Sequence, residues 1–403
     1  MDIYEKFQLL GVENAPGQEL RQGEDGEVLC DLDLSGDPVD FSHGDVNAFP
    51  PVPGSFSAFK KGVLEGAAQA YTEYRGRKQI RDDAAEKLSA FMGVTVDPDR
   101  EIILAPGTQG ALFMAAGSVI MPGDRVCFVQ PDYFAYRKLV VFFGGVCVPV
   151  NLNYMQYADR AGIDLKALES VFQSGVKVFM FSNPNNPTGV IYSHEEIRSI
   201  ADMAARYQVT LIVDELYSRQ IFDGRPYFHL CAEDTVPDSM VTIIGPSKTE
   251  SLSGYRLGTA FGTAGLIDRM EEVQAIMDLR CGGYNQAVFS VWFDEPEEWM
   301  KERVQQHQAI RDRMADVFGA EEGISFRLTE GGSYFFVELP ELTVSLKDFV
   351  KTARKAAGIT VTPGTEFGPQ FTHHFRINFS QDPKKAESAA ERLVRLVRFF
   401  KKR

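Results

Sequence analysis

The chain alternates between short, continuous apolar runs and longer amphipathic stretches over most of its length. Seven runs rich in β-branched and aromatic residues predict strands, at 101–104, 125–129, 146–150, 176–181, 210–213, 240–244 and 259–262. Helical periodicity separates most of them, as at 110–120, 165–172 and 194–207. Apolar strands separated by helices predict an α/β fold, with a large domain whose mostly parallel, seven-stranded sheet is covered by helices.

The two ends of the chain follow different patterns. Residues 1–57 are irregular and rich in Gly, Pro and Asp, which is typical of an extended arm lying on another surface. A long charged helix is expected at 295–318. Beyond it, strands at 325–327, 334–338, 359–361 and 375–379 mix with helices at 345–356 and 383–400. We therefore expect an arm at 1–57, a large domain at 58–300 and a smaller α+β domain at 301–403, to which the arm contributes.

The composition of the chain limits the classes of binding partner that can be expected. The chain has 403 residues, of which 44% are hydrophobic and 24% charged, and a net charge of -14 at pH 7. That acidity argues against nucleic acid and anionic membrane surfaces as partners, and no apolar run approaches the roughly 20 residues of a membrane helix. The five scattered cysteines, the absence of a basic leader and the lack of paired metal ligands predict a cytoplasmic protein without a metal site.

Loops that follow the expected strands carry unusual side chains, and ligands in such sheets bind at the carboxyl ends of strands. The turn through Gly107, Thr108 and Gln109 would present the N–H groups of a helix start to an anion, although an ordinary strand–helix turn has the same pattern. Tyr133 follows another strand and could stack on a planar ring or fill the core. Residues 182–189 form a loop fixed by prolines, in which Asn186 could donate to a phenolate-type oxygen.

Charged residues complete the set. Asp214 ends the strand at 210–213, where it could pair with a protonated ring nitrogen or cap a helix, and Tyr217 follows on the next turn. Lys248 stands just after a Gly-Pro turn, with Arg256 eight positions later. A lysine amine can form a Schiff base and an arginine can fork onto a phosphate, but most single lysines are surface charges. Arg376, inside an apolar strand, belongs either to a buried ion pair or to a clamp for a substrate carboxylate.

In this order and spacing, the Asn-Pro-Asn-Asn-Pro-Thr-Gly loop, the Asp-x-x-Tyr turn and the Ser-Lys pair with its later Arg resemble the fold-type I, pyridoxal-phosphate-dependent aminotransferases of class I/II. The likeness, closest to the aspartate aminotransferases, runs from about Asp33 to the C-terminus. It implies that Lys248 holds pyridoxal 5′-phosphate as a Schiff base and moves a proton, while Asp214 keeps the pyridine nitrogen protonated.

The resemblance also assigns the remaining contacts. It implies a phenolate oxygen held by Tyr217 and Asn186, a ring stacked on Tyr133, and a phosphate held by the turn at Gly107, Thr108 and Gln109 with Ser247 and Arg256. The substrate α-carboxylate would be held by Arg376. Asn186 of the loop at 182–189 and Gly36 of the arm would lie close to the same carboxylate. Two departures stand out: many relatives have a serine where this chain has Gly245, and the stretch 250–253 after the lysine is more polar than usual.

A dimer is implied as well. Tyr71 stands at the spacing before Gly76 at which the family places a tyrosine that reaches the partner's phosphate, so we expect a homodimer with shared active sites. Arg280 has the spacing before Asn285 of an arginine with which one branch of the aspartate aminotransferases grips a distal carboxylate across the dimer. The alternative is a surface or interface arginine. Another branch uses a lysine where this chain has Gln109.

The expected function is ping-pong transamination of an L-amino acid with a 2-oxo acid, with aspartate and glutamate as candidate substrates. The alternative is another pyridoxal phosphate reaction, such as decarboxylation, β-elimination or racemisation, because a fold does not fix a reaction. A remote alternative is the ligand-binding domain of a transcription regulator. Such proteins carry a DNA-binding unit, whereas only about 57 irregular residues precede the first helix expected here, and the charge is acidic.

Overall fold

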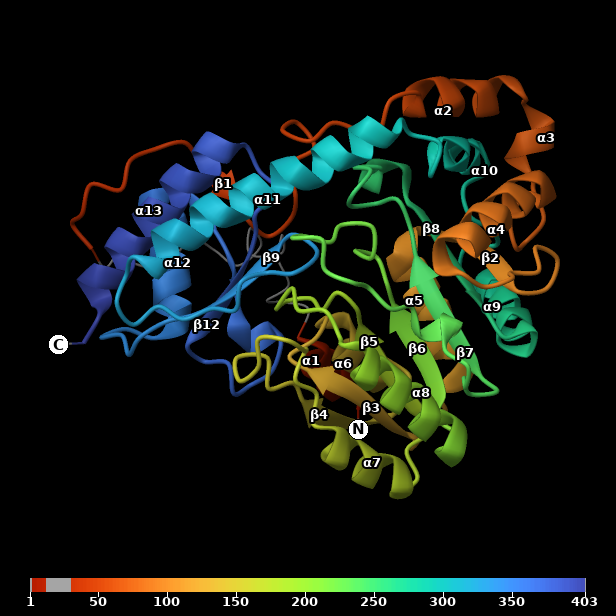
Figure 1. Ribbon diagram of the computed structural model, residues 1–403, viewed down its shortest axis with the longest axis horizontal. Helices are drawn as coiled ribbons and strands as arrows, with labels where there is room; N and C mark the ends of the chain where they lie inside the picture. The colour runs from red at the N-terminus through yellow and green to blue at the C-terminus, as the bar shows by residue number, and fades with distance from the viewer. Residues whose placement is uncertain (1, 12–29, 403) are drawn as a thin grey trace.

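The computed structural model describes residues 2–11 and 30–402 (Figure 1). Its central sheet has seven strands in the order β2-β8-β7-β6-β5-β3-β4. Their bounds are β2 Ile102–Pro106, β3 Arg125–Gln130, β4 Val146–Asn151, β5 Val178–Ser182, β6 Thr210–Asp214, β7 Met240–Ile244 and β8 Leu257–Gly262. Only β8 runs antiparallel to its neighbours, β2 and β7. The α/β class and the mostly parallel sheet are therefore confirmed.

Helices cover both faces of this sheet, as the continuous apolar strands require. One face is covered by α5 (Gly107–Val119), α6 (Ala135–Phe142) and α9 (Ala264–Met277). The other is covered by α7 (Leu165–Gln173) and α8 (His194–Tyr207), with α4 (Lys78–Met92) beside β2. Local capping fixes some of the helix starts: the Ser193 side chain accepts from the Glu196 amide and closes a capping box at α8.

The C-terminal part of the chain forms a second, smaller unit with its own apolar core. Its antiparallel sheet has the order β11-β12-β9, with β9 Tyr334–Glu338, β11 Thr362–Pro363 and β12 His374–Asn378. The helices α11 (Glu297–Gly319), α12 (Leu346–Ala357) and α13 (Pro383–Phe400) pack around it, and α11 runs between the two units (Figure 1). The arm joins this unit because β1 (Val39–Asp40) pairs in parallel with β10 (Ile359–Thr360).

The N-terminal segment is less irregular than the pattern predicts. Helix α1 (Ile3–Leu10) begins with a capping box between Asp2 and Glu5, ends at Gly11, and lies along α6 with Leu10 buried. Eight residues are too few for helical periodicity to stand out, so only the capping signals announce this helix. The strand expected at 325–327 is also wrong, because only Ser325 forms a bridge, to Glu338.

Other features of the described ranges limit the chemistry. No helix within 2–11 and 30–402 is long and apolar enough to cross a bilayer, and no group of three or more His, Cys, Asp or Glu there is arranged to hold a metal ion. All five cysteines are free thiols.

The remaining short helices α2 (Ser55–Leu64), α3 (Ala67–Ala70) and α10 (Gly283–Gln286) gather beside β2 and β8 at one end of the molecule (Figure 1).

Candidate active site

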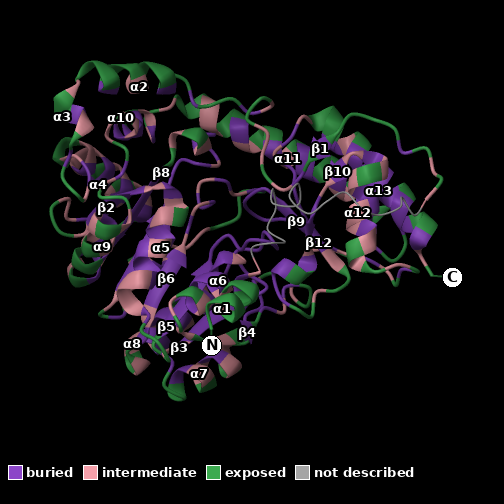
Figure 2. Ribbon diagram, turned by 180° about the vertical axis from the view of Figure 1, so that it is seen from behind, coloured by how far each residue is buried: buried purple, intermediate pink, exposed green. Residues whose placement is uncertain are grey.

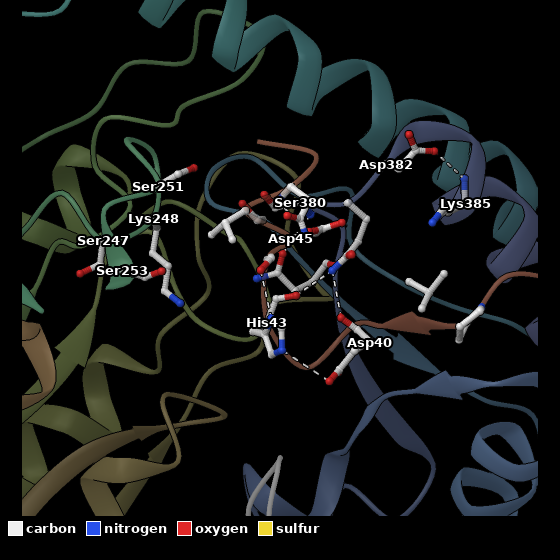
Figure 3. A pocket seen from close by; sticks show the side chains of 18 of the residues that line it. Asp40, His43, Asp45, Ser247, Lys248, Ser251, Ser253, Ser380, Asp382 and Lys385 are labelled. Atoms are coloured by element: carbon white, nitrogen blue, oxygen red, sulfur yellow. Dashed lines mark hydrogen bonds and ion pairs between the residues drawn. The ribbon is translucent and has the colours of Figure 1, made fainter. Parts of the chain in front are cut away.

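Two adjoining cavities lie at the carboxyl ends of the parallel strands. The inner cavity, of about 160 Å³, is lined by the loops after β2, β3, β5, β6 and β7. The outer cavity, of about 530 Å³, extends to the arm and to the C-terminal unit. Tyr217, Ser247, Lys248 and Ser253 line both, so the cavities meet at the lysine. Figure 3 shows Lys248 on one side of the outer cavity, with Asp40 and His43 of the arm facing it.

The start of α5 forms one end of the inner cavity. Gly107 has φ +81°, and a Cβ at this position would collide with the Arg256 guanidinium, so glycine allows the arginine to approach the turn. Arg256 donates to the Ser253 carbonyl at 3.0 Å and has no carboxylate partner in the described part of the chain. Thr108 and Gln109 line the same end. Free amides of a helix start and an uncommitted arginine together suit a phosphate.

The departure at Gly245 has a steric basis. A Cβ at this position would lie 3.0 Å from both Thr108 Cγ2 and Gly258 Cα, so the Thr108 methyl group occupies the space that a serine would need. Hydroxyls remain nearby, because Ser247 and Ser253 line both cavities. The Ser247 hydroxyl donates to a backbone carbonyl of β8 at 3.1 Å.

Polar groups surround the centre of the inner cavity. Asp214 ends β6, accepts from the Leu216 amide at 3.1 Å and has no basic partner among residues 2–11 and 30–402. Burial raises the pKa of its carboxyl from 3.8 to about 6. Tyr133 donates to Gln109 Oε1 at 3.0 Å, and Asn186 is buried on the opposite loop. A half-buried carboxylate without a cation suits a protonated ring nitrogen.

Arg376 of β12 is the most deeply buried of the expected site cations. It is 3% exposed, and nowhere in the described ranges does a carboxylate pair with it. Its terminal nitrogens donate to Asn186 Oδ1 at 3.0 Å and to the Ser42 carbonyl at 3.1 Å, while its Nε has no partner there. The guanidinium lies 4.4 Å from the Tyr334 ring centre. Arg376 itself lines neither cavity but lies directly behind Asn186 and Tyr334, which line the inner one.

Tyr71 and Arg280 are not brought to the cavities of their own chain. Tyr71 is 77% exposed, and the Arg280 guanidinium lies between the rings of Tyr71 and Tyr74, 5.3 and 5.2 Å from their centres. Arg280 donates to the Thr72 carbonyl at 2.7 Å. These side chains form one cluster, and none of them lines either cavity.

Gly36 of the arm, which was expected near the substrate carboxylate, packs against a different arginine. A Cβ at Gly36 would lie 2.8 Å from the guanidinium carbon of Arg392, on α13. The pairing of β1 with β10 places Gly36 before the paired strand and the turn at Ser42 and Gly44 after it. Ser42 therefore contacts Arg376, and Gly44 lines the outer cavity.

Sequence reasoning missed two buried residues of the site. Tyr334 lies in an apolar strand and gives no local signal, yet its hydroxyl meets that of Tyr217. Asp132 stands in the turn that the sequence did single out, and it accepts from the Ser182 amide at 3.0 Å and from the Ser182 hydroxyl. Burial raises the pKa of Asp132 well above its usual range. Its place directly before Tyr133 could have identified it as the group that fixes this turn.

Comparisons with known proteins agree with this geometry. Residues 38–393 match the family model of aminotransferase class I and II. Aspartate aminotransferase of Sulfurisphaera tokodaii is 29% identical over 329 residues, which cover 80% of this chain and 81% of that protein. Kynurenine–oxoglutarate transaminase 3 of Mus musculus is 26% identical and covers 96% of this chain and 93% of its own. The crystal structure of an aspartate aminotransferase from Rhodobacter sphaeroides 2.4.1 is 51% identical, with a TM-score of 0.94 and 100% of both chains covered.

Proposed function

Since the chain belongs to the aminotransferase class I and II family, we propose that it transfers the amino group of a dicarboxylic L-amino acid, aspartate or glutamate, to a 2-oxo acid, with pyridoxal 5′-phosphate as cofactor. The enzyme is an aminotransferase. Aspartate is the substrate named for the Sulfurisphaera and Rhodobacter relatives, which supports a dicarboxylic donor, whereas kynurenine is named for the mouse relative.

The observation that carries the proposal is the unpaired Arg376. An arginine that is 3% exposed, beside the cavities and without a carboxylate from the described residues, has an unfavourable burial cost unless a ligand supplies the anion. A substrate α-carboxylate would receive a two-pronged hydrogen bond there. Such a clamp would fix the orientation of Cα with respect to Lys248.

The inner cavity fits the cofactor. Its polar ends match the molecule: Arg256 and the start of α5 would hold the phosphate, and the Asp214 carboxylate would hold the proton on the pyridine nitrogen. Asn186 and Tyr217 would bond the ring oxygen, and Tyr133 would stack on the ring. When bound, the group supplies an electron sink for negative charge at the substrate Cα.

The residues of the chain provide binding and proton transfer around that sink. Lys248 lines both cavities, and its amine would carry the cofactor and move a proton at the substrate Cα. The buried hydroxyl of Tyr217 and the side chain of Asn186 would fix the orientation of the cofactor ring. Together these groups orient the Cα–H bond and limit water near it, which favours proton transfer over side reactions.

We also propose a homodimer in which Tyr71 and Arg280 complete the partner's site. Figure 2 shows α2 and α3 largely exposed at one end of the molecule. Large apolar side chains are exposed there, namely Phe56, Val63, Leu64, Tyr71, Tyr74, Leu279 and Tyr284. An apolar patch of this kind favours a protein partner. Arg280 stands within it, with a buried Nε that has no acceptor in the described residues.

The test is a panel of amino donors and 2-oxo acids with the purified, cofactor-loaded protein. In single turnovers, an amino donor should shift the visible absorbance band to that of the aminated cofactor, and a 2-oxo acid should restore it. Aspartate and glutamate should be the fastest donors. Product formation without the spectral half-reaction would contradict transamination, and equal rates with alanine, phenylalanine and aspartate would contradict a dicarboxylic substrate.

A further inference from the structure

We infer that Arg303 of α11 is a positioning residue for Lys248, acting through Ser251 and through the arm at Pro50. The inference rests on the proposed function, because it takes Lys248 as the residue that carries the cofactor. It gives a role to Ser251, one of the polar residues in the stretch 250–253.

The backbone just after Lys248 is held in an unfavourable conformation. Ser251, three residues on, has φ +57°, a left-handed conformation that non-glycine residues rarely adopt. Its amide donates to the Lys248 carbonyl at 3.1 Å, which closes a tight turn at the lysine. Such a conformation persists only where the surroundings hold it. The surroundings here are the Arg303 guanidinium, whose Nη1 donates to the Ser251 hydroxyl at 2.9 Å.

Arg303 is buried and bonded to neutral acceptors. It is 4% exposed, and no carboxylate of the described chain lies within ion-pair distance of it. Its Nη2 donates to the Pro50 carbonyl at 2.8 Å, and the guanidinium faces the Trp299 and Phe49 rings at 4.5 and 5.1 Å. Burial lowers the pKa of Arg303 to about 10, so it stays charged near neutral pH. Hydrogen bonds from a charged donor are stronger than those between neutral groups, so the Arg303 guanidinium holds both of these acceptors firmly.

A neighbouring set of contacts fastens the same loop. Glu250 is 1% exposed and shares Arg219 with Glu295, which lies two residues before α11 begins. The Glu250 carbonyl accepts from the Val52 amide at 3.0 Å. The lysine loop is therefore joined to the arm at 50–52 twice, through Arg303 and through this backbone bond.

These contacts set the geometry between the lysine and the substrate. The arm lines the outer cavity from Pro38 to Asn47, and Lys248 stands on the opposite side (Figure 3). Arg303 therefore fixes the turn that presents the lysine and, through the same guanidinium, the arm that faces it. Its loss should let the turn relax toward ordinary backbone angles and move the amine, while the phosphate end at Thr108 and Arg256 stays in place.

The test compares Arg303→Gln and Arg303→Lys in the cofactor-loaded enzyme. We expect Arg303→Gln to lower kcat by about tenfold or more and to shift the pH midpoint of the visible absorbance band by roughly half a pH unit or more. The affinity for cofactor should change little. Arg303→Lys, which keeps the charge and can reach one acceptor, should restore part of both effects. Arg313→Gln is the matched control, because Arg313 lies on the same helix but is exposed.

Two variants at Ser251 keep the inference testable if Arg303→Gln does not fold. Ser251→Ala removes the hydroxyl and keeps the unfavourable φ, whereas Ser251→Gly removes both. Ser251→Ala should therefore shift the band and lower kcat more than Ser251→Gly. Folded Arg303→Gln or Ser251→Ala proteins that lose only thermal stability, with unchanged band and kcat, would overturn the inference. If the wild-type protein takes up cofactor but aminates no oxo acid, only the proposed function is contradicted. If it takes up no cofactor, both the proposed function and the inference about Arg303 are contradicted.

Discussion

The hydroxyls of Tyr217 and Tyr334 lie 2.6 Å apart, and their rings meet edge-on with centres 5.4 Å apart. This contact joins the turn after β6 to β9, and so ties the central sheet to the C-terminal unit at the inner cavity. Burial and the neighbouring Tyr334 raise the pKa of Tyr217 well above its usual range. Burial by itself would raise the pKa of Tyr334, but the positive charges of Arg376 and Lys248 oppose the effect of burial, and the pKa of Tyr334 is lowered. Tyr334 is then the better donor, which leaves the Tyr217 proton for an acceptor in the cavity.

Removal of one of these hydroxyls should cost stability. Tyr334→Phe leaves the buried Tyr217 oxygen without its partner, so we expect a loss of about 1–3 kcal/mol in the free energy of unfolding. Urea unfolding of the cofactor-free protein measures it. The double variant Tyr217→Phe, Tyr334→Phe should lose less than the two single losses combined, because no unpaired hydroxyl remains. Additive losses would show that the two hydroxyls do not interact.

Arg376 should control substrate affinity and not the binding of cofactor. Arg376→Lys keeps a charge but loses the two-pronged hydrogen bond to the carboxylate. The value of kcat/KM for any amino donor should therefore fall, by an amount that corresponds to roughly 2–4 kcal/mol of lost transition-state stabilisation. Cofactor affinity, followed by visible absorbance, should change little. A matched control is Arg327→Lys, since Arg327 is also largely buried but pairs with Glu330 at a distance from both cavities. Equal losses of kcat/KM in both variants would contradict a specific clamp.

Asp214 should leave a pH signature in the cofactor-free protein. Burial raises the pKa of its carboxyl from 3.8 in the unfolded chain to about 6, so the folded state prefers the protonated form. Below pH 4 the carboxyl is protonated in both states and costs nothing. As pH rises from 4 to 6 the unfolded state ionises first, and the penalty on folding grows to about 3 kcal/mol.

Asp214→Asn isolates this effect from that of other titrating groups. The variant should gain stability relative to wild type as pH rises from 4 to 6, with a constant difference above pH 7. Thermal or urea unfolding at a series of pH values measures the difference. A difference that does not change with pH would refute the raised pKa.

Arg280 should act in the partner's site. Arg280→Ala should raise KM for aspartate far more than for alanine, because only the former has a distal carboxylate. Lys248→Ala should be inactive with an unchanged fold. When the two variants are unfolded, mixed and refolded, a heterodimer would contain one site with an intact Lys248 and an intact Arg280 from the other chain. Activity with aspartate should therefore return on mixing.

The mixing experiment has two clear controls. Lys248→Ala refolded alone, and Lys248→Ala mixed with the double variant Lys248→Ala, Arg280→Ala, should both stay inactive. If mixing restores nothing while dimers form, then Arg280 serves its own chain or no substrate at all.

The sequence by itself determined the architecture of the sheet and the contents of the loops. Continuous apolar runs are typical of strands that are buried on both faces, so they predict a parallel sheet before any contact is known. The loop residues Lys248, Asp214 and Asn186 follow strand ends, and strand ends in such a sheet share one edge. This is a local pattern with a fixed geometric consequence, which is why the structure brings these three to one cavity.

Only the tertiary structure decided contacts that depend on the arrangement of distant segments. The pairing of β1 with β10 places Gly36 beside Arg392 and Ser42 beside Arg376. Tyr334 gave no signal in the sequence, because a strand residue carries no sign of what lies across from it. Arg303 and Ser251 are 52 positions apart, and their contact follows from the packing of α11 against the lysine loop. Long-range packing chooses such partners, and local sequence cannot report them.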